Sequence, residues 1–503
     1  MMTKKENIGK FNMIFSTLEE LVPQDHKIRA YDQAVDWKFI YPLVEHLYST
    51  TGKPSIDPIV LFKMIFLNYI EGIHSIRKTC ERCQTDIAYR WFLRINLDEK
   101  VPDHSTFSQN LRRKFLETNL FKEIFTHIVK EAYEFGFIDP ENIFGDSTHV
   151  KASANKKKHQ DKIVQYTENL YYEDLKKDIN KDRLSHGKKE IDFEDDDEDT
   201  PNKNNTLECD DELTKESNED ELIEIISEEE KKKLVTYNQE TGEIKELDSR
   251  IKYKHIKEST VDKDAGHYHK GQHEEQFAYS ASAFCDKNGF ILETYITSGN
   301  KHDSITFKGL YEQYKKTELY KQTKLVCLDA GYRTPGVAKT ILDDGKKILV
   351  PYKRPMTKKG FFKKHEYVYD EYYDAYICPN NEFLRYTTTN KTGYREYKSN
   401  PKVCEKCPYI NQCTTSKNHT KIVTQHVWNE YLETCADIRY EIGTKEIYSK
   451  RKETIERCFA DGKENFGLRF TRYRGIKRVT QSLLLIFACM NFKKFALWKA
   501  KYA

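Results

Sequence analysis

The sequence predicts an α/β fold in which an all-helical N-terminal domain precedes a mixed sheet flanked by helices. Apolar residues recur at helical spacing through the first 135 residues, whereas short apolar runs with strand character begin at residue 142. From there strand-like runs alternate with helical segments, as expected when helices cover a sheet. A charged tract and a cysteine-rich tract interrupt this pattern, and we expect both to be insertions.

The N-terminal region contains two helices that stand out. Residues 58–67 carry the pattern of a buried helix, and residues 105–115 predict a helix capped by Asp103 or Ser105. The second helix becomes basic at its end. Small helical domains commonly place such a helix in the major groove of DNA. A packing domain with a solvated basic face is an equally good interpretation of this one helix.

The predicted sheet begins at residues 142–150. Residues 276–284 and 290–297 alternate apolar and polar positions around a turn at 286–289, which predicts a hairpin. The elements expected after it are a helix at 304–316, a strand at 324–328, a helix at 335–343, a strand at 347–351 and helices from about Val427 to the C-terminus. This order is that of an RNase H-like core.

The tract of residues 160–255 is rich in Glu, Asp, Lys and Asn. Its first part, up to Arg183, has helical spacing. Its acidic middle, residues 192–230, cannot bury enough apolar surface to fold alone, so we expect disorder there. The predicted domains are a DNA-binding domain at 1–135, core at 136–159, the charged insertion at 160–255, core again at 256–365, a cysteine-rich insertion at 366–425 and the C-terminal helices at 426–503.

Composition argues against a membrane or exported protein. The formal net charge is only +3, and the longest strongly apolar run, residues 483–490, is about half the length needed to span a bilayer. The N-terminus is polar and lacks the apolar core of a signal peptide. Twelve cysteines in such a chain indicate reduced thiols or metal ligands. We expect a soluble cytoplasmic protein.

Three acidic residues stand in unusual contexts. Asp146 and Asp329 each follow a short apolar run, and Glu456 lies inside a helical pattern. Gly145 allows close backbone approach beside the first, and Gly331 permits a tight turn after the second. A single aspartate after a strand usually serves a turn or a cap, but three such contexts together favour a shared site. Converging carboxylates can hold two divalent cations, the equipment for cutting and joining phosphodiester bonds.

The surroundings of Glu456 are the most specific of the three. Lys452, Glu456 and Lys463 are spaced so that they line one face of a helix. Glu456 would ligate metal while the lysines hold DNA phosphates as point charges. A surface helix with ion pairs is the simpler interpretation, but it predicts no link to the aspartates. Glu453 is a rival for the third ligand.

Six segments resemble the DDE transposases of bacterial insertion sequences. They are residues 144–156, 299–304, 329–335, 351–355, 451–463 and 468–475. The resemblance spans nearly the whole chain and is weakest across 160–255. The superfamily signature Tyr-x2-Arg-x3-Glu-x6-Lys is met at Glu456 and Lys463. Tyr448 and Arg451 sit one residue too far upstream, so the resemblance assigns them no role.

This resemblance implies a metal-dependent DNA transposase. It would cleave strands at transposon ends and join them to target DNA by direct in-line phosphoryl transfer, using two Mg²⁺ ions (with Mn²⁺ as a substitute). Asp146, Asp329 and Glu456 would hold the ions, and Lys463 would contact DNA near the cleaved bond. The implied partners are double-stranded DNA, as inverted repeats and target, and a second copy in a homodimer. Alternatives are a nuclease that does not join strands and a domesticated, non-catalytic DNA-binding protein.

A second metal site is suggested by four cysteines. Cys378, Cys404, Cys407 and Cys413 give the spacing C-x25-C-x2-C-x5-C, which suits a tetrahedral structural zinc. The surrounding sequence is poor in aliphatic residues and would benefit from a metal. Free reduced thiols are the alternative.

Two other groups are weaker candidates. His267, His269 and His273 have spacing that could ligate a metal, but a DNA-facing loop is the preferred interpretation. Cys80 and Cys83 lie in a helical pattern with no second pair nearby, so we expect an ordinary helix there.

Basic and aromatic residues mix in the segment 467–478, just beyond the predicted catalytic helix. Such a segment can neutralise phosphates and stack on an unpaired base, although a solvated basic loop is the alternative. The candidate DNA-binding residues are Arg112, Arg113, Lys114, Lys353, Arg354, Lys452, Arg469, Arg472, Arg474, Lys477 and Arg478.

Overall fold

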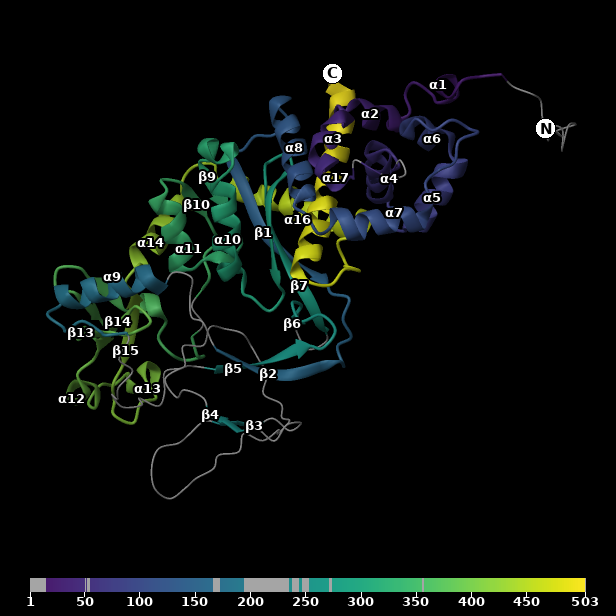
Figure 1. Ribbon diagram of the computed structural model, residues 1–503. Helices are drawn as coiled ribbons and strands as arrows, with labels where there is room; N and C mark the ends of the chain where they lie inside the picture. Colours follow the sequence, from purple (N-terminus) through teal and green to yellow (C-terminus); the bar gives the residue numbers. More distant parts are fainter. Residues whose placement is uncertain are drawn as a thin grey trace, which may run out of the picture. The chain divides into compact units, whose positions relative to one another are not determined.

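The computed structural model describes residues 15–49, 51, 55–165, 172–193, 235–237, 244–246, 253–270, 274–354 and 357–502. The chain divides into two compact units (Figure 1). The first comprises residues 1–160, 257–353 and 431–503, and the second comprises 161–256 and 354–430. The second unit is therefore built from two stretches that interrupt the first. Residues 194–230 of the acidic tract, for which we predicted disorder, lie outside the described residues.

The N-terminal region is helical, as predicted, and belongs to the first unit. Asp103 decides the start of α7, because its Oδ1 accepts a hydrogen bond from the backbone N–H of Ser105 at 2.8 Å. The basic end of the predicted helix, residues 111–115, forms a π-helical turn. The helices are α1 (Leu18–Leu21), α2 (Lys27–Gln33), α3 (Ile40–Val44), α4 (Pro58–Ile70), α5 (Ile76–Thr85), α6 (Ile87–Leu93), α7 (His104–Asn110) and α8 (Leu120–Glu134).

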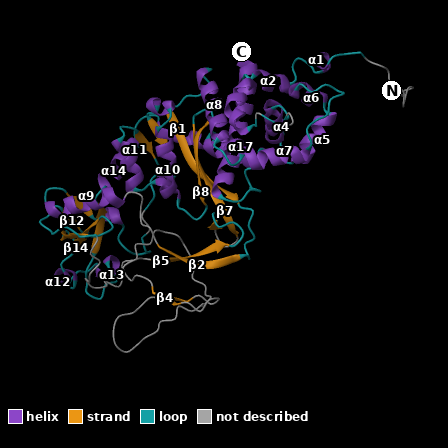
Figure 2. Cartoon of the chain, in the orientation of Figure 1, coloured by secondary structure: helices purple, strands orange, loops and turns teal. Residues whose placement is uncertain are grey.

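A mixed sheet forms the centre of the first unit (Figure 2). Strands β10, β9 and β1 are parallel neighbours, β7 runs antiparallel to β1, and both β8 and β6 pair with β7. The predicted hairpin is β7–β8, with Gly289 at a φ of +74° in its turn. The strands are β1 (Asn142–Lys151), β6 (Gly266–Lys270), β7 (Glu274–Cys285), β8 (Ile291–Ser298), β9 (Leu325–Cys327) and β10 (Lys347–Leu349).

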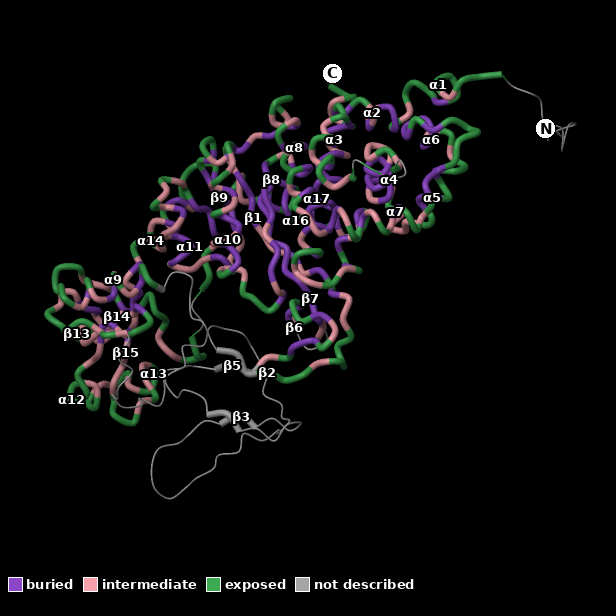
Figure 3. The backbone as a smooth tube through the Cα atoms, in the orientation of Figure 1, coloured by how far each residue is buried: buried purple, intermediate pink, exposed green. Residues whose placement is uncertain are grey.

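The helices that follow the hairpin were also predicted from the sequence. They are α10 (Asp303–Lys315), α11 (Pro335–Asp343), α14 (Asn429–Ile438), α15 (Thr444–Ser449), α16 (Ile455–Asn465) and α17 (Ile476–Tyr502). The last, α17, is buried along most of its length and packs against α8, α2, α4 and β8. Figure 3 shows buried stretches along β1 and β8. Among the described helices, none combines the length and apolarity needed to cross a membrane.

The second unit contains a five-stranded antiparallel sheet in sequence order, which we did not predict. Its strands are β11 (Val368–Asp370), β12 (Ala375–Ile377), β13 (Phe383–Thr389), β14 (Tyr394–Lys398) and β15 (Ile422–His426). The predicted helix before Arg183 is α9 (Tyr172–Ser185), which packs against β13. Short helices α12 (Pro401–Cys404) and α13 (Ile410–Cys413) lie between β14 and β15. Elsewhere β2 (His159–Gln165) pairs with β5 (Tyr253–Ser259), and β3 (Val235–Tyr237) with β4 (Ile244–Glu246).

A buried asparagine on α17 fastens this helix to the sheet. The Asn491 side chain accepts a hydrogen bond from the backbone N–H of Ile291 (2.9 Å) and donates one to its carbonyl (2.8 Å). Each buried group left without a partner costs about 1–3 kcal/mol. Asn491→Ala should therefore lower the free energy of unfolding by several kcal/mol in urea titrations. Lys477→Ala, at an exposed position of the same helix, should change it by less than about 0.5 kcal/mol. Equal stability of the two variants would contradict this account.

Candidate functional site

Asp146 lies in the middle of β1 (Asn142–Lys151), which confirms the strand predicted at 142–150. The pairing of β1 with β9 ends at Phe144, but the pairing with β7 continues from Phe144 to Lys151. Gly145 is required at this point, because a Cβ there would stand 2.6 Å from the Leu328 side chain and 2.7 Å from the Phe284 ring. The predicted close approach at Gly145 is thus confirmed.

Strand pairing brings Asp329 beside Asp146. In the parallel ladder Phe144 is paired with Cys327, and each aspartate comes two residues after its paired residue. A spacing of two returns a side chain to the same face of the sheet. Asp329 also begins the 3₁₀ turn Ala330–Tyr332, where its Oδ1 accepts a hydrogen bond from the backbone N–H of Gly331 at 2.5 Å. The residue therefore caps a turn and faces the site.

A chain of hydroxyl groups holds the elements around the two aspartates together. The buried Tyr332 hydroxyl is hydrogen-bonded to Ser147 Oγ at 2.7 Å, and Ser147 Oγ to Ser282 Oγ at 2.8 Å. Ser282 Oγ is in turn 3.2 Å from Thr306 Oγ1 on α10, so the chain links the turn after β9, β1, β7 and α10. Because Ser147 follows Asp146 directly, this chain helps to fix the backbone of β1 next to the carboxylate.

The Asp146 carboxyl group sits in an unfavourable electrostatic environment. Burial raises its pKa to about 6, and the negative charges of Asp329 and Asp303 act in the same direction. The Arg451 guanidinium and the backbone N–H of Ser147 oppose this rise. The neutral form of Asp146 is therefore favoured mainly because the carboxyl group is buried, and Arg451 offsets this effect only in part.

Arg451 is a site residue that the sequence signature failed to assign. Its side chain is buried, and its Nη2 lies 2.9 Å from Asp146 Oδ2. The residue sits in a 3₁₀ turn, Lys450–Lys452, and the chain is non-helical at Thr454 (φ −104°, ψ −100°) before α16 begins. The additional residue between Arg451 and Glu456 is thus absorbed outside a regular helix. That irregularity could not be inferred from spacing.

Glu456 and Lys463 both lie on α16, which packs against β1 and β7. The buried face of this helix is formed by Ile455, Cys458, Phe459 and Gly462. Glu456 is exposed beside that face, and Lys463 is partly buried two turns later. The predicted alignment of Lys452 with these two residues is wrong, because α16 starts only at Ile455. Glu453, the rival ligand, is exposed and also precedes the helix.

Asp303 is a fourth acidic residue near the aspartates. It occupies the first turn of α10, where His302 Nδ1 accepts a hydrogen bond from the backbone N–H of Ser304 at 3.2 Å. Its charge raises the pKa values of both Asp146 and Tyr332. In the sequence, the only indication that Asp303 lies near the acidic site was the resemblance of residues 299–304 to a segment of DDE transposases. Within the described ranges, no three His, Cys, Asp or Glu side chains are arranged to hold a metal ion.

The basic segment 467–478 is attached to the end of β1. The backbone N–H of Lys151 donates to the Arg469 carbonyl (3.1 Å), and that of Thr471 donates to the Lys151 carbonyl (2.9 Å). Phe470 is left exposed between them. Several of its arginines have protein acceptors: Arg469 pairs with Glu464, Arg474 donates to the Ser153 carbonyl and Arg478 pairs with Glu117. Arg472 and Lys477 are exposed or partly exposed.

The remaining candidate residues fall outside the acidic site. Of the basic residues, Arg112 and Arg113 are exposed on the π-helical turn, where Lys114 lies over the Tyr48 ring, and Lys353 and Arg354 are also exposed. The histidine segment was predicted as a loop, but His267 and His269 lie in strand β6, and His273 lies outside the described residues. Cys80 and Cys83 are buried on α5, as expected for an ordinary helix.

Removing Arg451 should destabilise the protein, because the largely buried Asp146 carboxylate would lose its ion-pair partner. Breaking a buried ion pair by removing one partner costs about 3–5 kcal/mol, and Asp146 keeps 22% of its side chain exposed. Arg451→Met should therefore lower the free energy of unfolding by about 3 kcal/mol in urea. The double variant Arg451→Met/Asp146→Asn should recover part of this loss, because no unpaired charge remains. An additive effect of the two substitutions would contradict the pairing.

Two comparisons with protein families match parts of the chain. Residues 16–113 match a transposase domain (DUF772), and residues 377–496 match a transposase DDE domain. The first match covers the N-terminal helices, and the second includes Glu456 and Lys463. No curated protein and no solved structure matches the chain. Over these two ranges, which include neither Asp146 nor Asp329, the chain is similar to transposases of the DDE type.

Proposed function

We propose that this protein is a DDE-type transposase of an insertion sequence, which cleaves DNA strands at transposon ends and transfers them to target DNA by in-line phosphoryl transfer. The observation that carries this proposal is that Asp146, on β1, and Asp329, in the turn after β9, each lie two residues beyond the same pair of neighbouring parallel strands. The strand order β8-β7-β1-β9-β10, with β7 antiparallel to β1, supports an RNase H-like core. Glu456, on a helix packed against β1, would complete the acidic set.

The acidic residues fit divalent cations by their chemistry. Mg²⁺ prefers carboxylate oxygen ligands, and a cation would stabilise the ionised form of Asp146, which burial and, to a smaller extent, the charges of Asp329 and Asp303 disfavour. Asp146, Asp329 and Glu456 are the residues that would hold two Mg²⁺ ions. The bound ions would supply charge stabilisation at the attacking and leaving oxygens of the phosphodiester.

The protein's own residues would position the reacting groups. Arg451 would keep the Asp146 carboxylate ionised and oriented, and the Tyr332–Ser147 hydrogen bond would hold the turn of Asp329 against β1. Lys463, on the same helix as Glu456, would contact a phosphate near the cleaved bond. The segment 467–478, attached to the end of β1, would carry the DNA backbone toward the site.

The partners of this reaction would be the inverted repeats of the element and the target duplex. We propose that two copies act together as a homodimer, since two transposon ends must be joined to one target. Arg112, Arg113, Lys353 and Arg354 are exposed and would add further phosphate contacts. A nuclease that does not join strands is the nearest alternative, and strand transfer from precut ends distinguishes the two. A non-catalytic DNA-binding protein would have no need of the acidic set.

The acidic set is tested by isosteric substitution. Asp146→Asn, Asp329→Asn and Glu456→Gln should each reduce Mg²⁺-dependent cleavage of labelled transposon ends by at least about 10³-fold. Mobility shifts with the same DNA should remain close to those of the unaltered protein. Glu453→Gln is the matched control and should retain activity. Full cleavage by Asp146→Asn would end the assignment, and loss with Glu453→Gln alone would move the third ligand to Glu453.

The raised pKa of Asp146 predicts a pH dependence of metal binding. A proton and a cation compete for this carboxylate, whose pKa is about 6 in the metal-free protein. Above that pH the group is ionised and affinity should be constant. Below it, affinity should fall about tenfold per pH unit. Mn²⁺ titration calorimetry from about pH 5 to pH 8 measures this, and a flat profile would contradict it. Asp146→Asn should remove the pH-dependent step.

A further inference from the structure

The second unit has a small and unusually polar core. Among its described residues, the buried cluster contains five side chains, and three of them are tyrosines: Tyr367, Tyr376, Leu384, Tyr397 and Val423. Tyrosine hydroxyls in and beside this cluster need partners, and those of Tyr369 and Tyr397 donate to Asp374. Such a core contributes little hydrophobic stabilisation, and small units of this kind are commonly held by a metal or by disulfides. The described cysteines form no disulfide.

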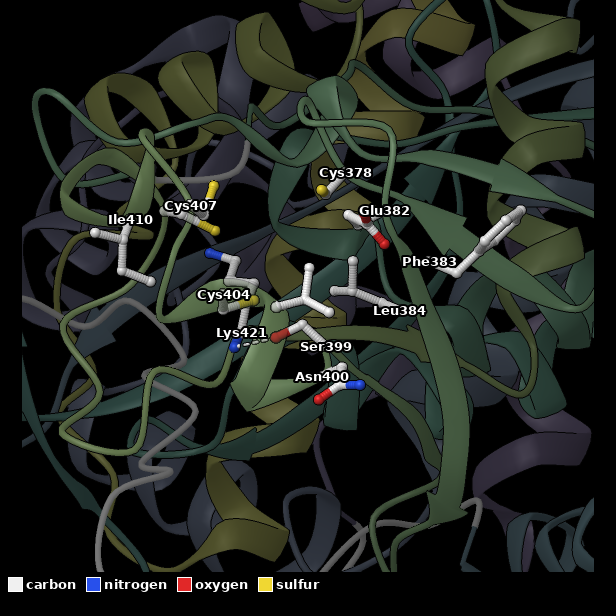
Figure 4. A pocket seen from close by; sticks show the side chains of 12 residues that line it. Cys378, Glu382, Phe383, Leu384, Ser399, Asn400, Cys404, Cys407, Ile410 and Lys421 are labelled. Atoms are coloured by element: carbon white, nitrogen blue, oxygen red, sulfur yellow. Dashed lines mark hydrogen bonds between the residues drawn. The ribbon is translucent and has the colours of Figure 1, made fainter.

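Four cysteines surround one cavity in this unit (Figure 4). Cys378, Cys404, Cys407 and Cys413 all line it, and its volume is about 30 Å³. A space of that size accommodates a single ion or water molecule and excludes an organic ligand. These four residues are the same set whose sequence spacing suits a tetrahedral metal site.

The backbone presents the cysteines from three separate turns. Cys378 begins the turn between β12 and β13, where its N–H donates to the Glu382 carbonyl at 2.9 Å. Cys404 and Cys407 flank a tight turn closed by a hydrogen bond from the Cys407 N–H to the Cys404 carbonyl at 3.0 Å. Cys413 ends α13. A shared ligand would therefore tie the sheet to both short helices.

The surroundings of the thiols favour their anionic form once a cation is present. The Tyr367 hydroxyl lies 3.2 Å from Cys413 Sγ, where it can donate to a thiolate. Lys421 also lines the cavity, with its ammonium group 5.1 Å from the centre of the Tyr367 ring. A thiolate cluster bound to a metal would carry net negative charge, which Lys421 would offset.

We propose that Cys378, Cys404, Cys407 and Cys413 bind one structural Zn²⁺ ion that holds the five-stranded sheet and helices α12 and α13 together. Four soft sulfur ligands with no open position select zinc for a structural role rather than for catalysis. In the described part of the chain no thiols are yet drawn together as a complete metal site. Zinc binding would therefore draw the four sulfur atoms closer together around the cavity.

The metal content of the full-length protein tests this proposal directly. Protein purified without chelators should contain one zinc per chain by elemental analysis and by native mass spectrometry. Cys404→Ser and Cys407→Ser should each lower that content to near zero. The double variant Cys80→Ala/Cys83→Ala is the matched control, because it removes a pair of the same spacing on α5, and it should retain the zinc. A zinc-free, folded protein, or zinc retained by all the serine variants, would overturn the proposal.

A second measurement keeps the test informative if the serine variants do not fold. The metal-free protein, prepared with a chelator and reductant, should bind one Co²⁺ and show the visible absorption of a tetrahedral thiolate site. Without metal, the protein should be cleaved by protease within residues 366–425. Addition of Zn²⁺ should restore its resistance to cleavage there. Iron in place of zinc, or a cobalt spectrum without thiolate bands, would contradict a zinc site built from four cysteines. None of these measurements depends on DNA cleavage. Their outcome is therefore independent of the proposed transposition activity.

Discussion

The parallel pairing of β1 with β9 is the constraint on which the acidic site depends. The ladder sets Phe144 opposite Cys327, and the aspartates that follow by two residues on each strand come to the same face. Gly145 permits the close contact with Leu328 and Phe284 that this pairing requires. A slip of one residue in the register would turn one carboxylate to the opposite face of the sheet. The site therefore depends on the register of three backbone pairs.

Bringing these carboxylates together has an energetic cost that the fold offsets only in part. Asp146 is mostly buried, and the negative charges of Asp329 and Asp303 oppose its ionisation. Arg451 supplies one positive charge, and the hydroxyl chain from Tyr332 to Thr306 fixes the surrounding elements. A buried carboxyl group whose ionised form is disfavoured in this way would be stabilised by a bound cation. Stability and metal affinity are consequently linked through the same carboxyl group.

The second unit is stabilised less by apolar burial and more by polar contacts than the first. Its sheet joins adjacent strands in sequence order and has a core of only a few buried side chains, most of them tyrosines. Hydrogen bonds from tyrosines to Asp374 provide order that apolar burial does not. The cysteine-lined cavity would add the missing cross-link. The transposase DDE match begins inside this unit and extends into α17, so the family relationship includes the cysteines as well as Glu456.

Local sequence patterns determined most of the secondary structure. The hairpin β7–β8, helix α11 and the buried helices α4 and α17 were predicted because apolar periodicity, Pro and Gly positions act within a few residues. The same local reasoning missed the five-stranded sheet of the second unit. Its strands are short and rich in tyrosine and charged residues, so they lack a clear alternation. It predicted β1 almost to the residue, although the pairing of β1 with β7 beyond Phe144 is a tertiary feature.

The sequence by itself determined which residues have the chemistry for a metal-dependent transposase: Asp146, Asp329, Glu456 and the four cysteines. Only the tertiary structure decided which of them come together. It brought Asp329 and Asp303 close to Asp146, and it paired Arg451 with Asp146 despite irregular spacing. The physical reason is that strand register and an irregular turn before α16 act between residues far apart in the chain. No local pattern records such distances.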